Sequence, residues 1–300
     1  MCSDIISGRK LNIGIIGAGF IGQLAHLMNY VELDNCRVIA IAEMRPQLRA
    51  KVMARFEIPR GYSTHHELLK DQDVEAVVVV VPRPHIARIV YDCLNAGKHV
   101  LSEKPMAGNS EQARSLIALA KEKNLIYVIG YMKRFDDGVI MAKKLFDDAV
   151  RSGDLGSILF ARVNCYMGNS YCNADGHIVT SEKPKYYEEE WPMVPNWLPK
   201  GLEKDFASFS NTFIHDINLI RFILGGDRPQ VEYADFDRGV GQLSILKFGK
   251  IKVSLETGQQ TNLHWEESID IIFEHGRINL KLPPALLRNV PASIELYRAG

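Results

Sequence analysis

The most constraining feature of this chain is a Gly-x-Gly-x-x-Gly motif that follows a short apolar run at residues 13–16. Its glycines are Gly17, Gly19 and Gly22, and a helical pattern follows at once. Gly17 permits a tight turn from strand to helix, Gly19 lets a pyrophosphate approach the backbone, and Gly22 allows close helix–strand packing. The amides at the start of the helix then face the phosphates. The motif therefore predicts a βαβ unit that binds a dinucleotide.

An acidic residue ends the next predicted strand, which covers residues 37–43. Glu43 stands about 20 residues beyond the glycines, where a carboxylate can accept hydrogen bonds from the adenosine ribose and repels a 2′-phosphate. Arg45 follows two residues later and could reach such a phosphate, so both cofactors stay open. We expect NAD or NADP, with NAD preferred.

Strand and helix patterns alternate through the first 130 residues. The run at residues 76–81 is continuous and β-branched, which is typical of a strand buried on both faces of a parallel sheet. Residues 1–130 are therefore expected to form an α/β domain with a doubly wound parallel sheet and ligands at the carboxyl ends of the strands. Glu43, Arg83, Lys104 and Tyr131 would lie at that edge.

Strand patterns dominate the second half of the chain, with one helix predicted over residues 213–224. The predicted strands cover residues 158–166, 231–236, 242–248, 251–256, 267–273 and 278–282. Residues 131–300 are therefore expected to form an α+β domain with an open-faced antiparallel sheet. One face would be covered and the other free for a partner subunit.

Composition narrows the class of partner. The 300 residues suit two domains, and 46% hydrophobic with 24% charged residues is ordinary for a globular protein. The formal net charge is zero, which removes the bulk electrostatic argument for nucleic acid or an anionic membrane. Five scattered cysteines lack a Cys-x-x-Cys pair, and no secretory signal or membrane-length apolar run is apparent. We expect a cytoplasmic protein without a metal, nucleic-acid or membrane partner.

Two residues are candidates for the chemistry. Lys104 follows a predicted strand and precedes Pro105, and its ammonium could stabilise a developing alkoxide, although most lysines are simply exposed. His215 has Asn211 four residues before it and Asn218 three after it, which places all three on one helical face. It could be a general acid or base, and a structural histidine is the alternative.

Five segments occur in an order that resembles the glucose–fructose oxidoreductase / inositol dehydrogenase / MocA (Gfo/Idh/MocA) family. They are residues 17–22, 82–85, 96–105, 130–135 and the His215 helix ending at Gly225. The run at 97–100 joined to Glu103-Lys104-Pro105 is the most specific part, and the resemblance covers nearly the whole chain. It implies a Rossmann domain, an open-faced sheet domain often used for oligomerisation, and NAD(P)-dependent oxidation or reduction of a sugar, inositol or related polyol.

The resemblance also implies site residues. Lys104 would be the catalytic lysine and His215 the acid/base histidine, oriented by Asn211. The implied cofactor contacts are Gly17, Gly19, Phe20, Ile21, Gly22, Glu43, Arg45, Pro82, His85, Glu103 and Lys104. The implied substrate contacts are Tyr131, Arg134, Asn211 and His215, with residues 166–173 and 186–197 as further lining. The implied assembly is a homodimer or homotetramer through the antiparallel sheet.

The sequence departs from the family at two points. The family usually has Asp where Asn211 stands, and often where Asn218 stands; an amide supplies no negative charge, so His215 is expected to be a weaker base. Three explanations follow: a reductive direction that needs only an acid, proton handling by Lys104, or weakened or lost turnover, as in a ligand sensor. Redox-neutral chemistry with tightly held NAD is a separate alternative. Members that resemble this chain usually run further, so we expect either a short protein or an altered last strand and altered dimer contacts.

Overall fold

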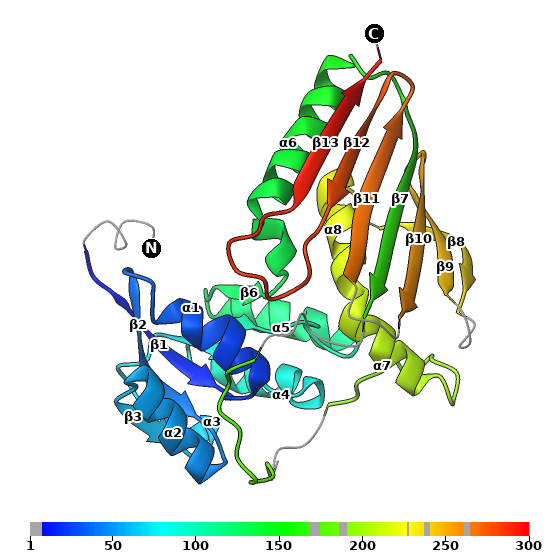
Figure 1. The fold of residues 1–300 in the computed structure, drawn as a ribbon. Helices are drawn as coiled ribbons and strands as arrows, with labels where there is room; N and C mark the ends of the chain where they lie inside the picture. The colour runs from blue at the N-terminus through cyan, green and yellow to red at the C-terminus, as the bar shows by residue number, and fades with distance from the viewer. Residues whose placement is uncertain are drawn as a thin grey trace. The chain divides into compact units, whose positions relative to one another are not determined.

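The structure is a computed structural model that describes residues 8–168, 175–185, 191–226, 228–236, 241–260 and 265–299. The chain forms two compact units (Figure 1). Unit 1 takes the described residues up to Gly130 together with those from Asp175 to Asn211, and unit 2 takes the remaining described residues. A segment from the second half of the chain therefore lies with the first unit. The division at residue 130 into a cofactor domain and a substrate domain stays a prediction.

Unit 1 contains a six-stranded sheet in the order β3-β2-β1-β4-β5-β6. All neighbouring strands run parallel. The strands are β1 (Leu11–Ile16), β2 (Cys36–Ala42), β3 (Arg60–Tyr62), β4 (Ala76–Val79), β5 (His99–Ser102) and β6 (Tyr127–Ile129). The strand order reverses direction between β1 and β4, so a crevice for ligands is expected at their carboxyl ends. This arrangement confirms the predicted doubly wound sheet.

Helices cover both faces of this sheet. They are η2 (Gly22–Leu27), α1 (Met28–Tyr30), α2 (Pro46–Phe56), α3 (His65–Leu69), α4 (Arg83–Asn95) and α5 (Ser110–Glu122). Val77 and Val79 of β4 pack in the core formed with α3, α4 and α5, whereas Val78 packs in the core formed with η2 and α2. Because both faces of β4 are buried, the strand needs apolar residues at every position, as its sequence predicted.

Local signals set where the helices begin and end. Pro46 is the first residue of α2, and Thr64 with Glu67 forms a capping box on α3. The Asn109 side chain accepts hydrogen bonds from the first amides of α5. In unit 2, helix α6 (Asp137–Ser152) ends at Gly153, whose φ is 71°. These residues satisfy groups at helix ends that have no partner inside the helix.

Unit 2 contains a seven-stranded sheet in the order β13-β12-β11-β7-β10-β9-β8. The strands are β7 (Ile158–Met167), β8 (Gln230–Asp235), β9 (Gln242–Phe248), β10 (Ile251–Gln259), β11 (Trp265–Phe273), β12 (Gly276–Lys281) and β13 (Ser293–Arg298). Neighbours are antiparallel except β7 and β10, which are parallel. The sheet is thus mixed at this pair. Since β10 and β11 run in opposite directions with β7 between them, β7 can be antiparallel to only one of them.

Helices cover one face of the unit 2 sheet (Figure 1). They are α6, the short η3 (Met132–Phe135) and α8 (Ile214–Leu224); α7 (Glu203–Thr212) precedes α8. Val163, Leu255 and Ile269 are almost fully buried on this face. On the opposite face, Arg162 and Glu256 form an ion pair that solvent reaches. The open-faced sheet is therefore confirmed. Within the ranges described, no helix combines the length and apolarity needed to cross a membrane.

Candidate functional site

The glycine motif forms the turn that its spacing predicted. Gly17 has a φ of +98°, and a Cβ added there would lie 2.1 Å from the carbonyl oxygen of Val80. A Cβ on Gly22 would lie 2.6 Å from the carbonyl oxygen of Gly17. A Cβ on Gly19 would meet nothing within 4 Å. Two of the glycines are therefore required by the protein's own packing, and the third borders space that a ligand can use.

Replacing Gly17 and Gly19 one at a time should separate an effect on stability from an effect on dinucleotide binding. Gly17→Ala forces a β-carbon against Val80 at a backbone angle that favours glycine, so it should cost about 3 kcal/mol of unfolding free energy. Gly19→Val should stay within about 0.5 kcal/mol of the wild type, because its side chain points into open space. It should nevertheless lose affinity for a dinucleotide. Urea denaturation and NADH titration measure the two effects, and equal destabilisation by both variants would contradict this account.

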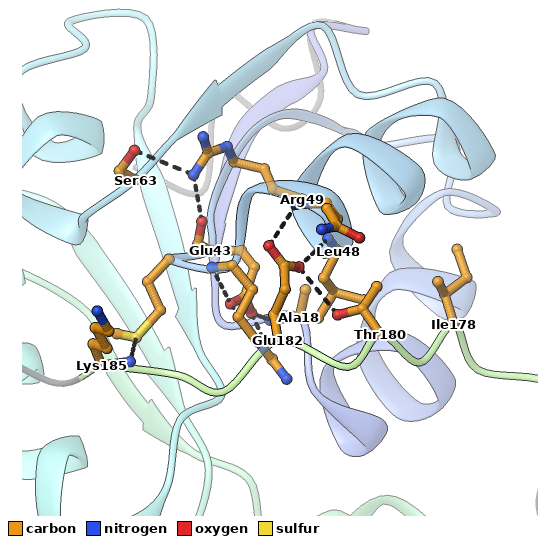
Figure 2. Close-up of polar contacts among 12 residues, drawn as sticks. Ala18, Glu43, Leu48, Arg49, Ser63, Ile178, Thr180, Glu182 and Lys185 are labelled. Carbon is orange, nitrogen blue, oxygen red and sulfur yellow. Dashed lines mark hydrogen bonds and ion pairs between the residues drawn. The ribbon is translucent and has the colours of Figure 1, made fainter.

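Glu43 lies beside the glycine turn and is 5% exposed. Its carboxylate accepts a hydrogen bond of 3.0 Å from the amide of Ala18, and bonds of 2.8 and 2.9 Å from the Arg45 guanidinium (Figure 2). Burial raises the pKa of Glu43, but the hydrogen bonds from Arg45 and Ala18 outweigh it and hold the pKa below its ordinary value. The open space at Gly19 and this ionised acceptor together fit the diphosphate and the ribose of a dinucleotide.

The other predicted cofactor residues lie along the ends of the parallel strands. Glu103 follows β5, and its carboxylate lies 2.9 Å from Nε2 of His26 and accepts the Lys104 amide at 3.2 Å. Pro82 precedes α4, and its carbonyl accepts the amide of the buried His85 at 3.0 Å. Phe20 and Ile21 start the helix after the glycine turn. The ring of Phe20 meets that of His177 edge-on at 4.9 Å.

Lys104 lies at the same edge of unit 1, and the peptide bond between it and Pro105 is cis. Its ammonium donates to the backbone oxygen of Asn211 at 2.6 Å and lies 3.3 Å from that residue's side-chain oxygen. Asn211 therefore contacts the catalytic candidate Lys104, a partner that the sequence analysis did not assign to it. An ammonium held between two neutral oxygens keeps its capacity to donate to a substrate oxygen.

Unit 2 holds a separate group of predicted site residues around the start of α8. His215 is the second residue of α8, and the Tyr131 ring approaches it edge-on with 6.2 Å between centroids. Burial raises the pKa of Tyr131. Arg134 donates to the side-chain oxygen of Asn218 at 2.6 Å. Tyr131, Arg134, His215 and Asn218 thus form one polar group.

Helix α8 confirms the helix expected over residues 213–224, but the structure corrects the expectation that Asn211 shares its face. Helix α7 ends at Thr212 and α8 begins at Ile214, so Phe213 interrupts the run. His215 and Asn218 share a face of α8, but Asn211 belongs to α7 and to the other compact unit. Residues 203–224 contain no proline or glycine to mark the break, and the Phe213 side chain is buried at the interruption. The meeting of Lys104 and His215 at one substrate stays a prediction. The lining by residues 166–173 and 186–197 stays one too, and of these residues 169–173 and 186–190 lie outside the described residues.

A buried charged cluster behind α8 was not predicted. It comprises Lys133 of η3, Cys165 of β7, Asp216 of α8 and Glu267 of β11, and is called the Lys133 cluster below. Lys133 forms an ion pair with Glu267, and their side chains are 11% and 1% exposed. Trp265 donates to the other oxygen of Glu267 at 3.1 Å. One sequence signal was available, because Glu267 stands at an inward position of a strand whose other inward residues are apolar or aromatic.

The Lys133 cluster predicts a pH effect on stability. Burial and the neighbouring Glu267 raise the pKa of Asp216 well above its ordinary value. The protonated carboxyl therefore contributes stability below the ordinary pKa of aspartate, and this contribution is lost as pH rises through the raised pKa. Asp216→Asn cannot ionise, so its unfolding free energy should fall less between about pH 5 and about pH 8 than that of the wild type. Urea denaturation at several pH values tests this, with the exposed Asp34→Asn as control; parallel curves would contradict it.

Two groups of side chains have the spacing of metal ligands. The first contains His65, His66 and Asp92, and the second contains Cys165, Asp216 and Glu267. In each group a carboxylate already pairs with a cationic side chain outside the group. Arg88 pairs with Asp92 at 3.1 Å, and Lys133 pairs with Glu267. We therefore assign no metal to either group. Cys36, Cys93 and Cys165 are free thiols, and Cys2 and Cys172 lie outside the described residues.

Comparisons with known proteins agree with this geometry. Residues 11–131 match the oxidoreductase family with an NAD-binding Rossmann fold, Gfo/Idh/MocA. The chain is 30% identical to levoglucosan dehydrogenase of Pseudarthrobacter phenanthrenivorans over 229 residues, which cover 72% of this chain and 52% of that protein. It is 25% identical to myo-inositol 2-dehydrogenase of Thermotoga maritima over 281 residues, 89% of this chain and 74% of that protein. The chain thus spans about half of one relative and three quarters of the other.

Solved structures show the same fold. The structure of scyllo-inositol dehydrogenase from Lactobacillus casei with bound NAD(H) and scyllo-inositol superposes with a TM-score of 0.68. It is 20% identical to this chain, and the match covers 94% of this chain and 77% of that one. At this identity the likeness extends to the fold.

Proposed function

This chain belongs to the Gfo/Idh/MocA family of oxidoreductases, and we propose on that premise that it transfers hydride between NAD(H) and a sugar, inositol or related polyol. The observation that carries the proposal is the pairing of open space at Gly19 with the buried, ionised Glu43. Relatives named for levoglucosan and for inositols favour a cyclic polyol as the substrate class. The reacting group is a secondary hydroxyl or the corresponding carbonyl.

The proposed chemistry divides between the two units. The nicotinamide, when bound, accepts or supplies the hydride. Lys104 donates a hydrogen bond to the reacting oxygen and stabilises negative charge there, while its contacts with Asn211 hold the ammonium in place. His215 takes the hydroxyl proton during oxidation and returns it during reduction. Glu43 binds the adenosine ribose, and Tyr131 and Arg134 contact the substrate beside His215.

Two measurements test the proposal directly. Titration with NADH, followed by fluorescence, should show saturable binding. Absorbance at 340 nm should then report turnover with a panel of inositols, anhydro-sugars and their ketones. If the protein binds neither NADH nor NADPH, it cannot transfer hydride to or from a nicotinamide cofactor, and the proposal fails. Activity confined to linear aldehydes would contradict the proposed substrate class.

A second candidate is a ligand sensor that keeps the fold and has lost turnover. The observation that favours it is Asn211, a neutral partner for Lys104 where the family resemblance predicted Asp. A sensor would bind NADH and a polyol without any change at 340 nm. Asn211→Asp distinguishes a weakened enzyme from a sensor, because it restores a negative charge beside Lys104 and should raise turnover only in an enzyme.

We also propose that the protein is cytoplasmic and forms a homodimer or homotetramer through the open face of the unit 2 sheet. The open face supports this assembly because it exposes Tyr233 of β8 and Leu243 of β9. Sedimentation velocity measures the state of assembly, and a monomer at micromolar concentration would contradict it.

A further inference from the structure

The segment formed by residues 175–185 lies across the part of unit 1 that we expect to hold adenosine. The Gln23 side-chain amide donates to the carbonyl of Ile178 at 3.0 Å, and its oxygen accepts the Ile178 amide at 2.7 Å. Gln23 belongs to the helix that starts at the glycine motif. Further along the segment, the Lys185 amide donates to the sulfur of Met44 at 3.0 Å. Met44 directly follows Glu43 in the sequence. The 175–185 segment is thus attached on both sides of the predicted ribose site.

Glu182 of this segment occupies the N-terminus of α2. Its two carboxylate oxygens accept the amides of Gln47 and Leu48 at 3.1 and 3.0 Å, and Thr180 donates its hydroxyl at 3.1 Å (Figure 2). Pro46 has no amide hydrogen, so these are the first two donors that α2 offers. Desolvation raises the pKa of Glu182, but these bonds and the charge of Arg45 outweigh it, so the pKa lies below its ordinary value.

The N-terminus of α2 is where we expect the 2′-phosphate of NADP(H) to bind. Helix α2 begins three residues after Glu43, so any group attached to a ribose held by Glu43 comes close to its first amides. Helix N-termini bind phosphate through such amides, and a nearby arginine usually completes a 2′-phosphate site. Here the Glu182 carboxylate already accepts the first two amides of α2. The Arg45 guanidinium donates to both oxygens of Glu43, and it also interacts electrostatically with Glu182.

We propose that Glu182 is a specificity-determining residue that excludes NADP(H), because its carboxylate occupies the phosphate-binding amides of α2 from within the chain. Glu43 alone would repel a 2′-phosphate through charge, whereas Glu182 also fills the place where that phosphate would bind. The inference rests on the proposed function, since it concerns the choice between two cofactors of the same site.

The test measures the Kd of NADH and of NADPH for the wild type, Glu182→Gln and Glu182→Ala. Glu182→Gln removes the charge at nearly constant shape, and Glu182→Ala also frees both amides. The wild type should prefer NADH, and the ratio of the NADPH Kd to the NADH Kd should fall about tenfold in Glu182→Gln and further in Glu182→Ala. The matched control is Glu111→Gln, which removes a carboxylate from the first turn of α5 and should leave the ratio unchanged.

The outcomes separate this inference from the proposed function. If the wild type binds neither cofactor, the proposed function fails. If the wild type binds NADH and both variants lose affinity for the two cofactors in parallel, Glu182 only holds the 175–185 segment in place, and the inference is overturned. A wild type that prefers NADPH would overturn it as well. Titration with ADP and 2′,5′-ADP repeats the comparison without the nicotinamide. The ratio of the 2′,5′-ADP Kd to the ADP Kd should then fall in the Glu182 variants.

Discussion

Replacing Lys104 by methionine is expected to lower kcat by about 10³-fold while the protein stays folded and binds NADH. Methionine keeps a similar length but cannot donate a hydrogen bond or carry charge. The reacting oxygen then develops negative charge without a cation beside it. Because this charge is largest in the transition state, the loss should fall mainly on kcat. Lys104 contacts Asn211 through its ammonium, so the same change frees that residue's oxygens.

Steady-state kinetics with the substrate found in the polyol panel, together with NADH titration, measure the effect. Lys121→Met is a suitable control, because Lys121 lies in the last turn of α5 and is exposed. It changes the net charge by the same amount and should keep wild-type kcat. Full activity of Lys104→Met would show that Lys104 is not catalytic.

Replacing Lys133 by methionine is expected to lower the unfolding free energy by about 3–5 kcal/mol, because it leaves a buried carboxylate without its cation. Glu267 loses its ion-pair partner, and Asp216 loses the only positive charge of the Lys133 cluster. Neither carboxyl can turn to water, since Asp216 and Glu267 are 1% and 3% exposed. Glu267 is thus left as a buried negative charge that no cation compensates.

Urea denaturation at neutral pH measures this effect. Lys144→Met is the matched control, because the exposed Lys144 pairs with Asp148 one turn along α6, and such pairs contribute about 0.5 kcal/mol. Adding Glu267→Gln and Asp216→Asn to Lys133→Met removes the uncompensated charges and should restore part of the lost stability. A Lys133→Met variant within about 1 kcal/mol of the wild type would show that water or another group already compensates Glu267.

The Lys133 cluster also bears on the proposed site. Asp216 is the neighbour of His215, and Lys133 lies between Tyr131 and Arg134 in sequence. Its members come from η3, β7, α8 and β11, so the cluster joins the start of α8 to the sheet. A buried ion pair contributes little net stability, but its need for exact partners makes other packings unfavourable.

Local spacing was sufficient for the parts of the site that lie within one strand–turn–helix unit. Gly17, Gly19 and Gly22 have separate predicted tasks, and the structure has close packing at Gly17 and Gly22 and open space at Gly19. Glu43 follows β2 because strand, turn and helix lengths in a βαβ unit are restricted. The continuous apolar run of β4 likewise indicated burial on both faces. The sequence by itself therefore determined the Rossmann sheet and the fold class.

Only the tertiary structure decided which distant residues complete each group. Glu182 caps α2 from 134 residues away, and Lys133 meets Glu267 across the same separation. The break at Phe213, which moves Asn211 to Lys104, also has no proline or glycine to announce it. The physical reason is common to these cases. A turn or a cap depends on a few neighbouring residues, whereas a contact across more than 100 residues depends on how whole faces bury their apolar side chains.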